Sequence, residues 1–171
     1  MVHPLILLAR NTLIQHLGRG KPQTPPRAGK SPPQACFVSL KKRGELRGCI
    51  GTLEPTQPSL EDEVAANTLA SATRDPRFSP VTLDELEEIT LSIDCLSPPE
   101  PVKSAGELDP KRYGVIVTWN DRRGVLLPDL EGVNTAAEQI EICRKKAAIP
   151  PGVPVTLERF TVERIPEQDE D

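Results

Sequence analysis

Aromatic residues and histidines are scarce in this chain of 171 residues. Phe, Trp and Tyr together make up 3%, so aliphatic side chains must build most of the hydrophobic core. The two histidines, His3 and His16, both lie near the N-terminus, and the four cysteines show no Cys-x-x-Cys spacing. A zinc site built from Cys and His ligands therefore has little support, and we predict no metal centre.

Long apolar runs are also absent. The run from Leu5 to Ala9 is short and no small-residue cleavage site follows it, so the sequence shows no secretory signal. No stretch approaches the roughly 20 apolar residues that a membrane span needs. We therefore expect a cytoplasmic protein with reduced thiols and no membrane segment.

A strong excess of basic residues is missing as well. The net charge is −4, and the last five residues contain four acids that account for all of it. The remaining chain has 21 basic and 21 acidic residues, so binding to nucleic acid driven by charge has little support.

Proline, by contrast, is abundant, with 19 residues that divide the chain into short elements. Hydrophobic periodicity and capping residues predict helices over 4–17, from Leu60 to about Arg74, and from Thr135 to about Ala148, with a helical turn beginning at Thr82. Predicted strands cover 36–42, 45–53, 89–96, 113–119, 125–127 and 155–162. Residues 18–35 are expected to form a Pro/Gly-rich basic loop, 120–124 a hairpin loop, and 166–171 a disordered acidic tail.

The order of these elements indicates an α+β fold. Two hairpins imply mainly antiparallel pairing, unlike the doubly wound parallel sheet of alternating α/β proteins. One domain of two lobes over residues 5–165 is expected for this length.

The stretch from Leu46 to Gly51, Leu-Arg-Gly-Cys-Ile-Gly, is the strongest indication of a site. It places Arg47 and Cys49 two residues apart, and Gly48 and Gly51 in a strand indicate close approach of another group. Arg47 would favour the reactive thiolate of Cys49, so Cys49 is a candidate nucleophile, but the sequence favours a small residue packed between two close backbones. Arg47 is a candidate anion ligand or a member of an ion pair, with Asp75 or Glu45 as partner.

The hairpin that contains this stretch turns at Arg43-Gly44. A loop of two or four residues would pair Lys41 with Leu46, Val38 with Cys49, and Cys36 with Gly51. Cys36 and Cys49 would then lie on one face of the sheet as diagonal neighbours. A loop of another length would shift this register.

A polar stripe on the second helix faces the same hairpin in our interpretation. Asn67, Ser71 and Arg74 follow each other at i, i+4 and i+7 and either line a ligand site or form a solvated face. Asp75 and Arg77 come directly after them. Arg77 is expected to bind ligand or to organise the loop through hydrogen bonds to carbonyl groups.

Several of these segments, in order, resemble the AMMECR domain family, whose bacterial members are called AmmeMemoRadiSam system protein A. The matching segments are Ala35 to Lys42, Leu46 to Gly51, Asp75 to Phe78, Pro80-Val81, Leu96 to Pro99, and Gly124 to Pro128. The resemblance covers roughly residues 5–165. It implies an α+β fold with a duplicated β-α-β-β unit and two lobes around a cleft.

The biochemical activity of the family that the chain resembles is unsettled, so two function hypotheses remain open. In the first, the protein is a non-catalytic module that binds a small ligand or a partner and acts with a Memo-like protein and a radical S-adenosylmethionine (SAM) protein. In the second, it is an enzyme or enzyme subunit that uses Arg47 and Cys49 on a small anionic or nucleotide substrate. The absence of an obvious general base, metal cluster or P-loop pattern favours the module.

Overall fold

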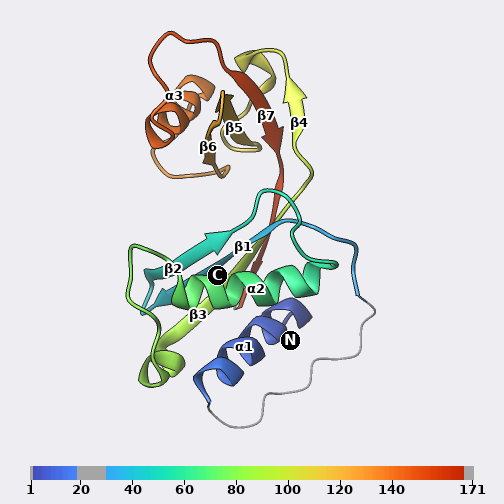
Figure 1. Ribbon diagram of the computed structural model, residues 1–171, viewed down its shortest axis with the longest axis vertical. Helices are drawn as coiled ribbons and strands as arrows, with labels where there is room; N and C mark the ends of the chain where they lie inside the picture. Colours follow the sequence, from blue (N-terminus) through green and yellow to red (C-terminus); the bar gives the residue numbers. More distant parts are fainter. Residues whose placement is uncertain (1, 19–29, 168–171) are drawn as a thin grey trace. The chain divides into compact units, whose positions relative to one another are not determined.

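The computed structural model describes residues 2–18 and 30–167. They form two compact units, one of Met1–Leu96 with Glu163–Asp171 and the other of Ser97–Val162. We call them unit 1 and unit 2. Each contains a four-stranded sheet with antiparallel pairings and at least one helix, which confirms the α+β class (Figure 1).

Unit 1 holds the first sheet, whose strands lie in the order β2-β1-β3-β8. Its elements are α1 (Pro4–Leu17), β1 (Cys36–Lys42), β2 (Glu45–Gly51), α2 (Leu60–Thr73), the 3-10 helix η1 (Leu83–Glu88), β3 (Ile89–Leu96) and β8 (Val162–Pro166). As far as Leu96, the helices and strands lie close to the segments that the sequence predicted.

Capping residues mark the ends of the helices of unit 1. Nδ1 of His3 accepts a hydrogen bond from the backbone N–H of Leu5 at 3.1 Å, and Gly18, with φ of 77°, ends α1 in the left-handed region. Ser59 caps α2 by accepting from the N–H of Asp62 at 3.1 Å. Acidic side chains in the first turn of α2 further stabilise the positive end of the helix dipole.

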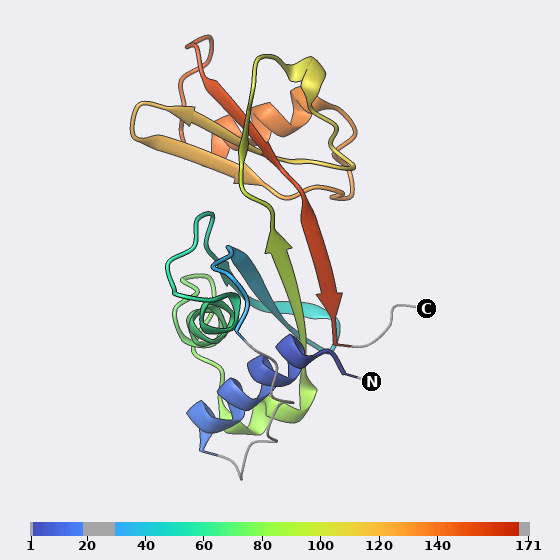
Figure 2. The ribbon, with the colours of Figure 1, turned by 90° about the vertical axis from the view of Figure 1, so that its right-hand side faces the viewer.

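The core of unit 1 lies between these two helices and one face of the sheet. That face carries alternate residues of β1 and β3, and α1 and α2 cover it (Figures 1 and 2). The strand residues are Cys36, Val38, Leu40, Leu91, Ile93 and Cys95. Because successive side chains of a strand alternate between faces, Phe37, Ser39 and Lys41 point to the other face.

Unit 2 repeats the chain order of unit 1 and has the sheet order β4-β7-β5-β6. Its elements are β4 (Glu100–Val102), η2 (Ala105–Glu107), β5 (Gly114–Trp119), β6 (Arg122–Leu126), α3 (Ala136–Lys146) and β7 (Thr156–Phe160). In both units a hairpin is followed by a helix and by a strand that pairs with the first strand of the hairpin. The duplication is therefore present, and each copy reads strand, strand, helix, strand along the chain.

Three predictions of strand extent are wrong. The expected loop 120–124 shrinks to Asn120 and Asp121, because β6 already begins at Arg122. The expected strand 155–162 ends at Phe160 as β7, and a further strand, β8, begins at Val162 and belongs to the other sheet. Glu100–Val102, which the sequence did not predict as a strand, pairs with β7 as the edge strand β4.

The predicted register of the first hairpin is also wrong beyond the turn. Lys41 pairs with Leu46 as expected, but Leu40 pairs with Gly48, and Arg47 is left as the extra residue of a β-bulge. Ser39 therefore pairs with Cys49, and Phe37 with Gly51. The one-residue shift places Cys49 on the face opposite Cys36, because the side-chain period of a strand is two.

The expected loop 18–35 and tail 166–171 lie mainly outside the described residues. Where the structure does describe them, they make defined contacts. Ser31 donates to the carboxylate of Glu61 through its N–H, at 2.9 Å. Pro166 ends β8, and the backbone N–H of Glu167 donates to the carbonyl of Leu91 at 3.1 Å, so the expectation of disorder is wrong for these two residues.

Candidate functional site

Cys49 lies on the face of the first sheet that α1 and α2 leave uncovered. Its Sγ accepts a hydrogen bond from Oγ of Ser39, the residue directly opposite on β1, at 3.3 Å. Cys49 is half-buried, whereas the three other cysteines are fully buried. It is therefore the thiol that solvent and small molecules reach most readily.

Asp75 and Arg77 hold the backbone of Cys49 from the loop after α2. The carboxylate of Asp75 accepts from the N–H of Cys49 at 2.9 Å, and Nη2 of Arg77 donates to the carbonyl of Cys49 at 3.3 Å. Both residues were predicted as site residues, and the structure brings them to Cys49. The predicted hydrogen bond from Arg77 to a carbonyl group is also present.

Asp75 and Arg77 form an ion pair in which the carboxylate is buried. Asp75 also accepts from Nε and Nη2 of Arg77, at 3.0 and 2.8 Å, and its side chain is only 2% exposed. These hydrogen bonds, chiefly from the Arg77 side chain, hold the pKa of Asp75 well below its ordinary range. Asp75 therefore stays ionised and is a poor proton acceptor.

The guanidinium of Arg77 remains accessible. Its side chain is 55% exposed and stacks over the ring of Phe78, with 5.5 Å from Cζ to the ring centroid. Nε and Nη2 donate to Asp75 and Cys49, while Nη1 donates no hydrogen bond to any of the described residues. Nη1 therefore presents two N–H donors at the surface beside Cys49.

The thiol of Cys49 is not activated. Burial raises its pKa above the ordinary value, and this outweighs the opposing effects of the hydrogen bond from Ser39 and the charge of Arg77. The two histidines offer no base, because His3 caps α1 and His16 is in the last turn of the same helix, on the covered face of the sheet. The geometry thus provides no activated nucleophile of the kind that a cysteine protease has.

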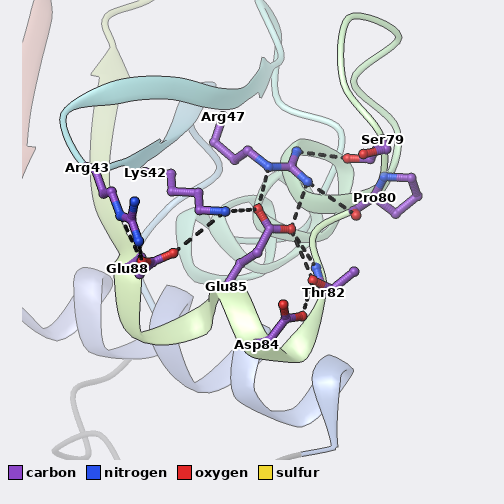
Figure 3. A network of polar contacts seen from close by, with 9 residues as sticks. All are labelled: Lys42, Arg43, Arg47, Ser79, Pro80, Thr82, Asp84, Glu85 and Glu88. Carbon is purple, nitrogen blue, oxygen red and sulfur yellow. Dashed lines mark hydrogen bonds and ion pairs between the residues drawn. The ribbon is translucent and has the colours of Figure 1, made fainter.

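Arg47 lies in a separate polar network at the bulge (Figure 3). Nε and Nη2 donate to the two carboxylate oxygens of Glu85 at 2.9 and 3.0 Å, a bidentate pair. Nη1 donates to the carbonyl of Ser79 at 2.8 Å, and Nη2 also contacts the carbonyl of Pro80 at 3.3 Å. The expected partners Asp75 and Glu45 are wrong, and the partner is Glu85.

Glu85 is the centre of this network. Lys42 donates to it at 3.1 Å, and the N–H of Thr82 donates to it at 3.1 Å, which completes the capping box of η1 (Figure 3). The hydrogen bonds, led by that of Arg47, lower the pKa of Glu85 to about 2. The capping pattern was visible in the sequence, but nothing there indicated that Arg47 would share the same carboxylate.

Asn67 and Ser71 join α2 to the hairpin and do not reach the uncovered face. Ser71 accepts from the N–H of Ile50 at 2.9 Å and donates to the carbonyl of Val38 at 2.7 Å. Asn67 donates to the carbonyl of Cys36 at 2.9 Å. Both side chains are buried, so the expectation of a solvated helix face is wrong for them.

The glycines of the motif permit close packing. A Cβ on Gly48 would lie 2.2 Å from the carbonyl oxygen of Ser71, and one on Gly51 would lie 2.3 Å from the ring of Phe37. Arg74, the third residue of the polar stripe, follows α2 as its C-cap and is exposed. Of the predicted set, only Cys49, Asp75 and Arg77 meet at an accessible point, and sequence reasoning missed Ser39 there.

Two further observations concern metal ions and membranes. No group of three or more His, Cys, Asp or Glu side chains suited to a metal ion occurs within residues 2–18 and 30–167. Within the same part of the chain, every helix is too short or too polar to cross a bilayer.

The fold and this site define a class of α+β protein with two units, each built on a four-stranded sheet. In the first unit a strand cysteine, Cys49, lies between Gly48 and Gly51. The AMMECR1 family model matches residues 6–165, and the chain belongs to this family.

The relatives agree with that assignment. A Thermotoga maritima protein is 57% identical over 130 residues, covering 75% of this chain and 75% of its own length. A Clostridium acetobutylicum protein, CA_C1420, is 44% identical across 94% of this chain, which spans 35% of the longer relative. The crystal structure of the uncharacterized Pyrococcus horikoshii protein PH0010 has a TM-score of 0.81 and 29% identity, covering 94% of this chain and 88% of that one.

Proposed function

We propose that this protein is a non-catalytic binding module that takes up a small anionic group, free or on a partner, at the surface formed by Ser39, Cys49 and Arg77. We call this surface the Cys49 site. The observation that supports it most directly is the open Nη1 edge of Arg77 beside a half-buried thiol. A guanidinium edge with two free donors suits a carboxylate or phosphate oxygen.

The arrangement of the neighbouring charges favours binding over catalysis. Asp75 holds Arg77 in place through two side-chain contacts and at the same time fixes the backbone of Cys49. Its lowered pKa makes it a poor base, and the raised pKa of Cys49 keeps the thiol protonated at neutral pH. A protonated thiol and a fixed guanidinium are both donors to an incoming oxyanion.

The partners that we propose are a Memo-like protein and a radical SAM protein, as the family resemblance implies. Either would present an acidic side chain or a bound anionic group to the Cys49 site. Arg47 has no direct part in this function, because Glu85 and two carbonyl groups engage its guanidinium.

Protection of Cys49 from alkylation tests the proposal. The three buried cysteines have pKa values raised to about 12 for Cys36 and about 11 for Cys95 and Cys143, so Cys49 should react first with iodoacetamide in the folded protein. Inorganic phosphate, or the purified Memo-like protein, should slow this reaction saturably. Sodium chloride at equal ionic strength should not.

Two arginine variants provide the matched comparison. Arg77→Gln should abolish the protection, whereas Arg74→Gln, which removes the same charge nearby from an exposed position, should retain it. Two results would show that the Cys49 site does not bind anions. One is protection that persists in Arg77→Gln. The other is a failure of phosphate and of both proposed partners to protect Cys49.

The enzyme hypothesis keeps one specific observation in its favour, which is the accessibility of Cys49 relative to the other cysteines. In a reconstituted mixture with both proposed partners, Cys49→Ser would separate the two functions. A module should retain the activity of the mixture, since a hydroxyl still donates a hydrogen bond. Loss of that activity in a folded Cys49→Ser protein would favour a nucleophile.

A further inference from the structure

Unit 2 contains a hollow of about 430 Å³, within the size range of small-molecule sites. It lies at the end of the second sheet where β5 begins and β7 ends. Three segments line it, namely 97–100, 112–113 and 159–161. The Cys49 site belongs to unit 1, so the hollow is a different place on the molecule.

Two arginines of this hollow each contact the same aromatic ring, that of Tyr113. Cζ of Arg159 lies 4.3 Å from the centroid of Tyr113, and Cζ of Arg112 lies 5.0 Å from it. Both distances fall within the range of cation–π attraction, so the ring of Tyr113 positions both guanidinium groups at the hollow.

The two guanidinium groups differ in how far they are engaged. Arg159 donates through Nε to Glu100 at 3.1 Å and through Nη1 to the carbonyl of Glu107 at 2.7 Å. Within the described residues, Arg112 makes no hydrogen bond or ion pair through its side chain, and its contact with Tyr113 is the one that positions it. Arg112 therefore keeps its five donors for a ligand.

The charge of the lining favours an anion. Arg112 and Arg159 contribute two positive charges, and Glu100, the one acid among the lining residues, contributes a single negative charge. The Glu100 side chain is 65% exposed, so solvent weakens its competition for Arg159. An oxyanion bound by Arg112 would face a site with a surplus positive charge.

The rest of the lining offers little further polar chemistry. Pro98 and Pro99 have no backbone N–H, and the Phe160 ring packs against Gly114, where a Cβ would lie 2.3 Å from it. Ser97 and Thr161 engage each other, since the N–H of Thr161 donates to Oγ of Ser97 at 2.8 Å. A ligand that fits must therefore combine an oxyanion with an apolar or aromatic part.

We propose that this hollow binds a small organic anion, with its carboxylate or phosphate on Arg112 and Arg159 and its organic part against Tyr113 and the Pro98-Pro99 wall. The organic part should add affinity that inorganic phosphate lacks, because it buries apolar surface against Pro98, Pro99 and Tyr113. We call this place the Tyr113 site.

Tyr113 is the single tyrosine of the chain and provides a direct reporter. The full-length protein with ¹³C-labelled tyrosine is titrated with phenyl phosphate, benzoate, inorganic phosphate and phenol. We expect saturable shifts of the Tyr113 ring signals with phenyl phosphate or benzoate, and the stronger of the two identifies the oxyanion. Phenol and inorganic phosphate should bind at least about tenfold more weakly, a difference of about 1.4 kcal/mol.

Substitutions locate the binding. Arg112→Gln should weaken the affinity for the better probe by at least about tenfold, and Glu100→Gln should strengthen it, because Arg159 then loses its competing carboxylate. Lys111→Gln is the matched control, since it removes the same charge from the neighbouring residue, which does not line the hollow. Trp119 fluorescence verifies that each variant is folded.

Two results would overturn the Tyr113 site. One is the absence of any saturable Tyr113 shift up to about 10 mM of the organic anions, which would nearly saturate a site with a Kd near 1 mM. The other is an equal loss of affinity in Lys111→Gln and Arg112→Gln, which would show general charge attraction. Neither result bears on Cys49 alkylation, so the two proposals fail independently.

Discussion

Arg47 and Arg77 of unit 1 have opposite environments. The Arg47 side chain is 13% exposed and is bound by a carboxylate and two carbonyl groups, whereas that of Arg77 is 55% exposed and keeps one edge open. Arg47 stabilises the fold, because its removal would leave the carboxylate of Glu85 buried without its main partner, at a cost in folding free energy. Arg77 remains available to a ligand.

Replacing Arg47 by Ala should therefore destabilise the protein. Glu85, whose side chain is 11% exposed, would keep Lys42 but lose its bidentate partner, and the loop at Ser79 would lose an anchor. We expect a loss of about 3 kcal/mol and a melting temperature lower by roughly 6–12 °C. Differential scanning calorimetry at neutral pH measures this.

Arg43→Ala is the control for that experiment. Arg43 also pairs with a glutamate, Glu88, but its side chain is 77% exposed, so the change should cost at most about 1 kcal/mol. Equal small effects of the two substitutions would contradict a structural role for Arg47 and return it to the set of candidate ligand residues.

At the scale of the elements, the sequence predicted helices better than strand pairing. The extent of α1 and the N-terminus of α2 followed from apolar spacing and from caps such as Ser59 and Gly18, which are local signals. The bulge at Arg47 has no such signal, because it depends on where α2 and η1 meet the hairpin. One unpredicted extra residue moved Cys49 to the other face of the sheet.

The candidate site was only partly predictable for the same reason. Asp75 and Arg77 were found because they lie beside a helix end, but Ser39 became a neighbour of Cys49 only through the shifted register. Arg47 was predicted at the site because it lies two residues from Cys49. Its true partner, Glu85, is 38 residues away in the sequence.

The close approach of α2 explains why a glycine, Gly48, stands beside the bulge. The helix α2 approaches so closely that Ser71 exchanges hydrogen bonds with the backbone of both hairpin strands. In unit 2, Gly124 of β6 has the same relation to α3, since a Cβ there would lie 2.1 Å from the carbonyl oxygen of Cys143. The repeat of topology thus extends to a glycine that admits a helix.

We predict that Gly48→Ala destabilises the protein by about 1–3 kcal/mol, because backbone atoms of α2 must move to admit the methyl group. The loss of the Ser71–Ile50 hydrogen bond adds to this effect. Urea unfolding followed by circular dichroism measures the free energy. Gly106→Ala, where the nearest atom to the new Cβ is 3.5 Å away, should be nearly neutral, and comparable losses in both variants would refute the close-approach argument.

For the whole molecule, the two units have separate hydrophobic cores. The core of unit 1 draws on α1, α2, β1, β3 and Ile165 of β8, and that of unit 2 on α3, β5, β6 and the segments around them. No residue belongs to both clusters among those that the structure describes. The local opening of each core should therefore depend mainly on its own side chains.

Hydrogen exchange on two core variants tests this independence. Ile93→Ala removes a side chain that is fully buried in unit 1 and should cost about 2–5 kcal/mol. We expect faster amide exchange in β1 and β3 with unchanged protection in β5 and β7. Val117→Ala should give the reverse pattern, because Val117 is fully buried in the core of unit 2. If either substitution lowers protection equally in both sheets, the units open as one cooperative body, and a change at one site would then alter the stability of the other.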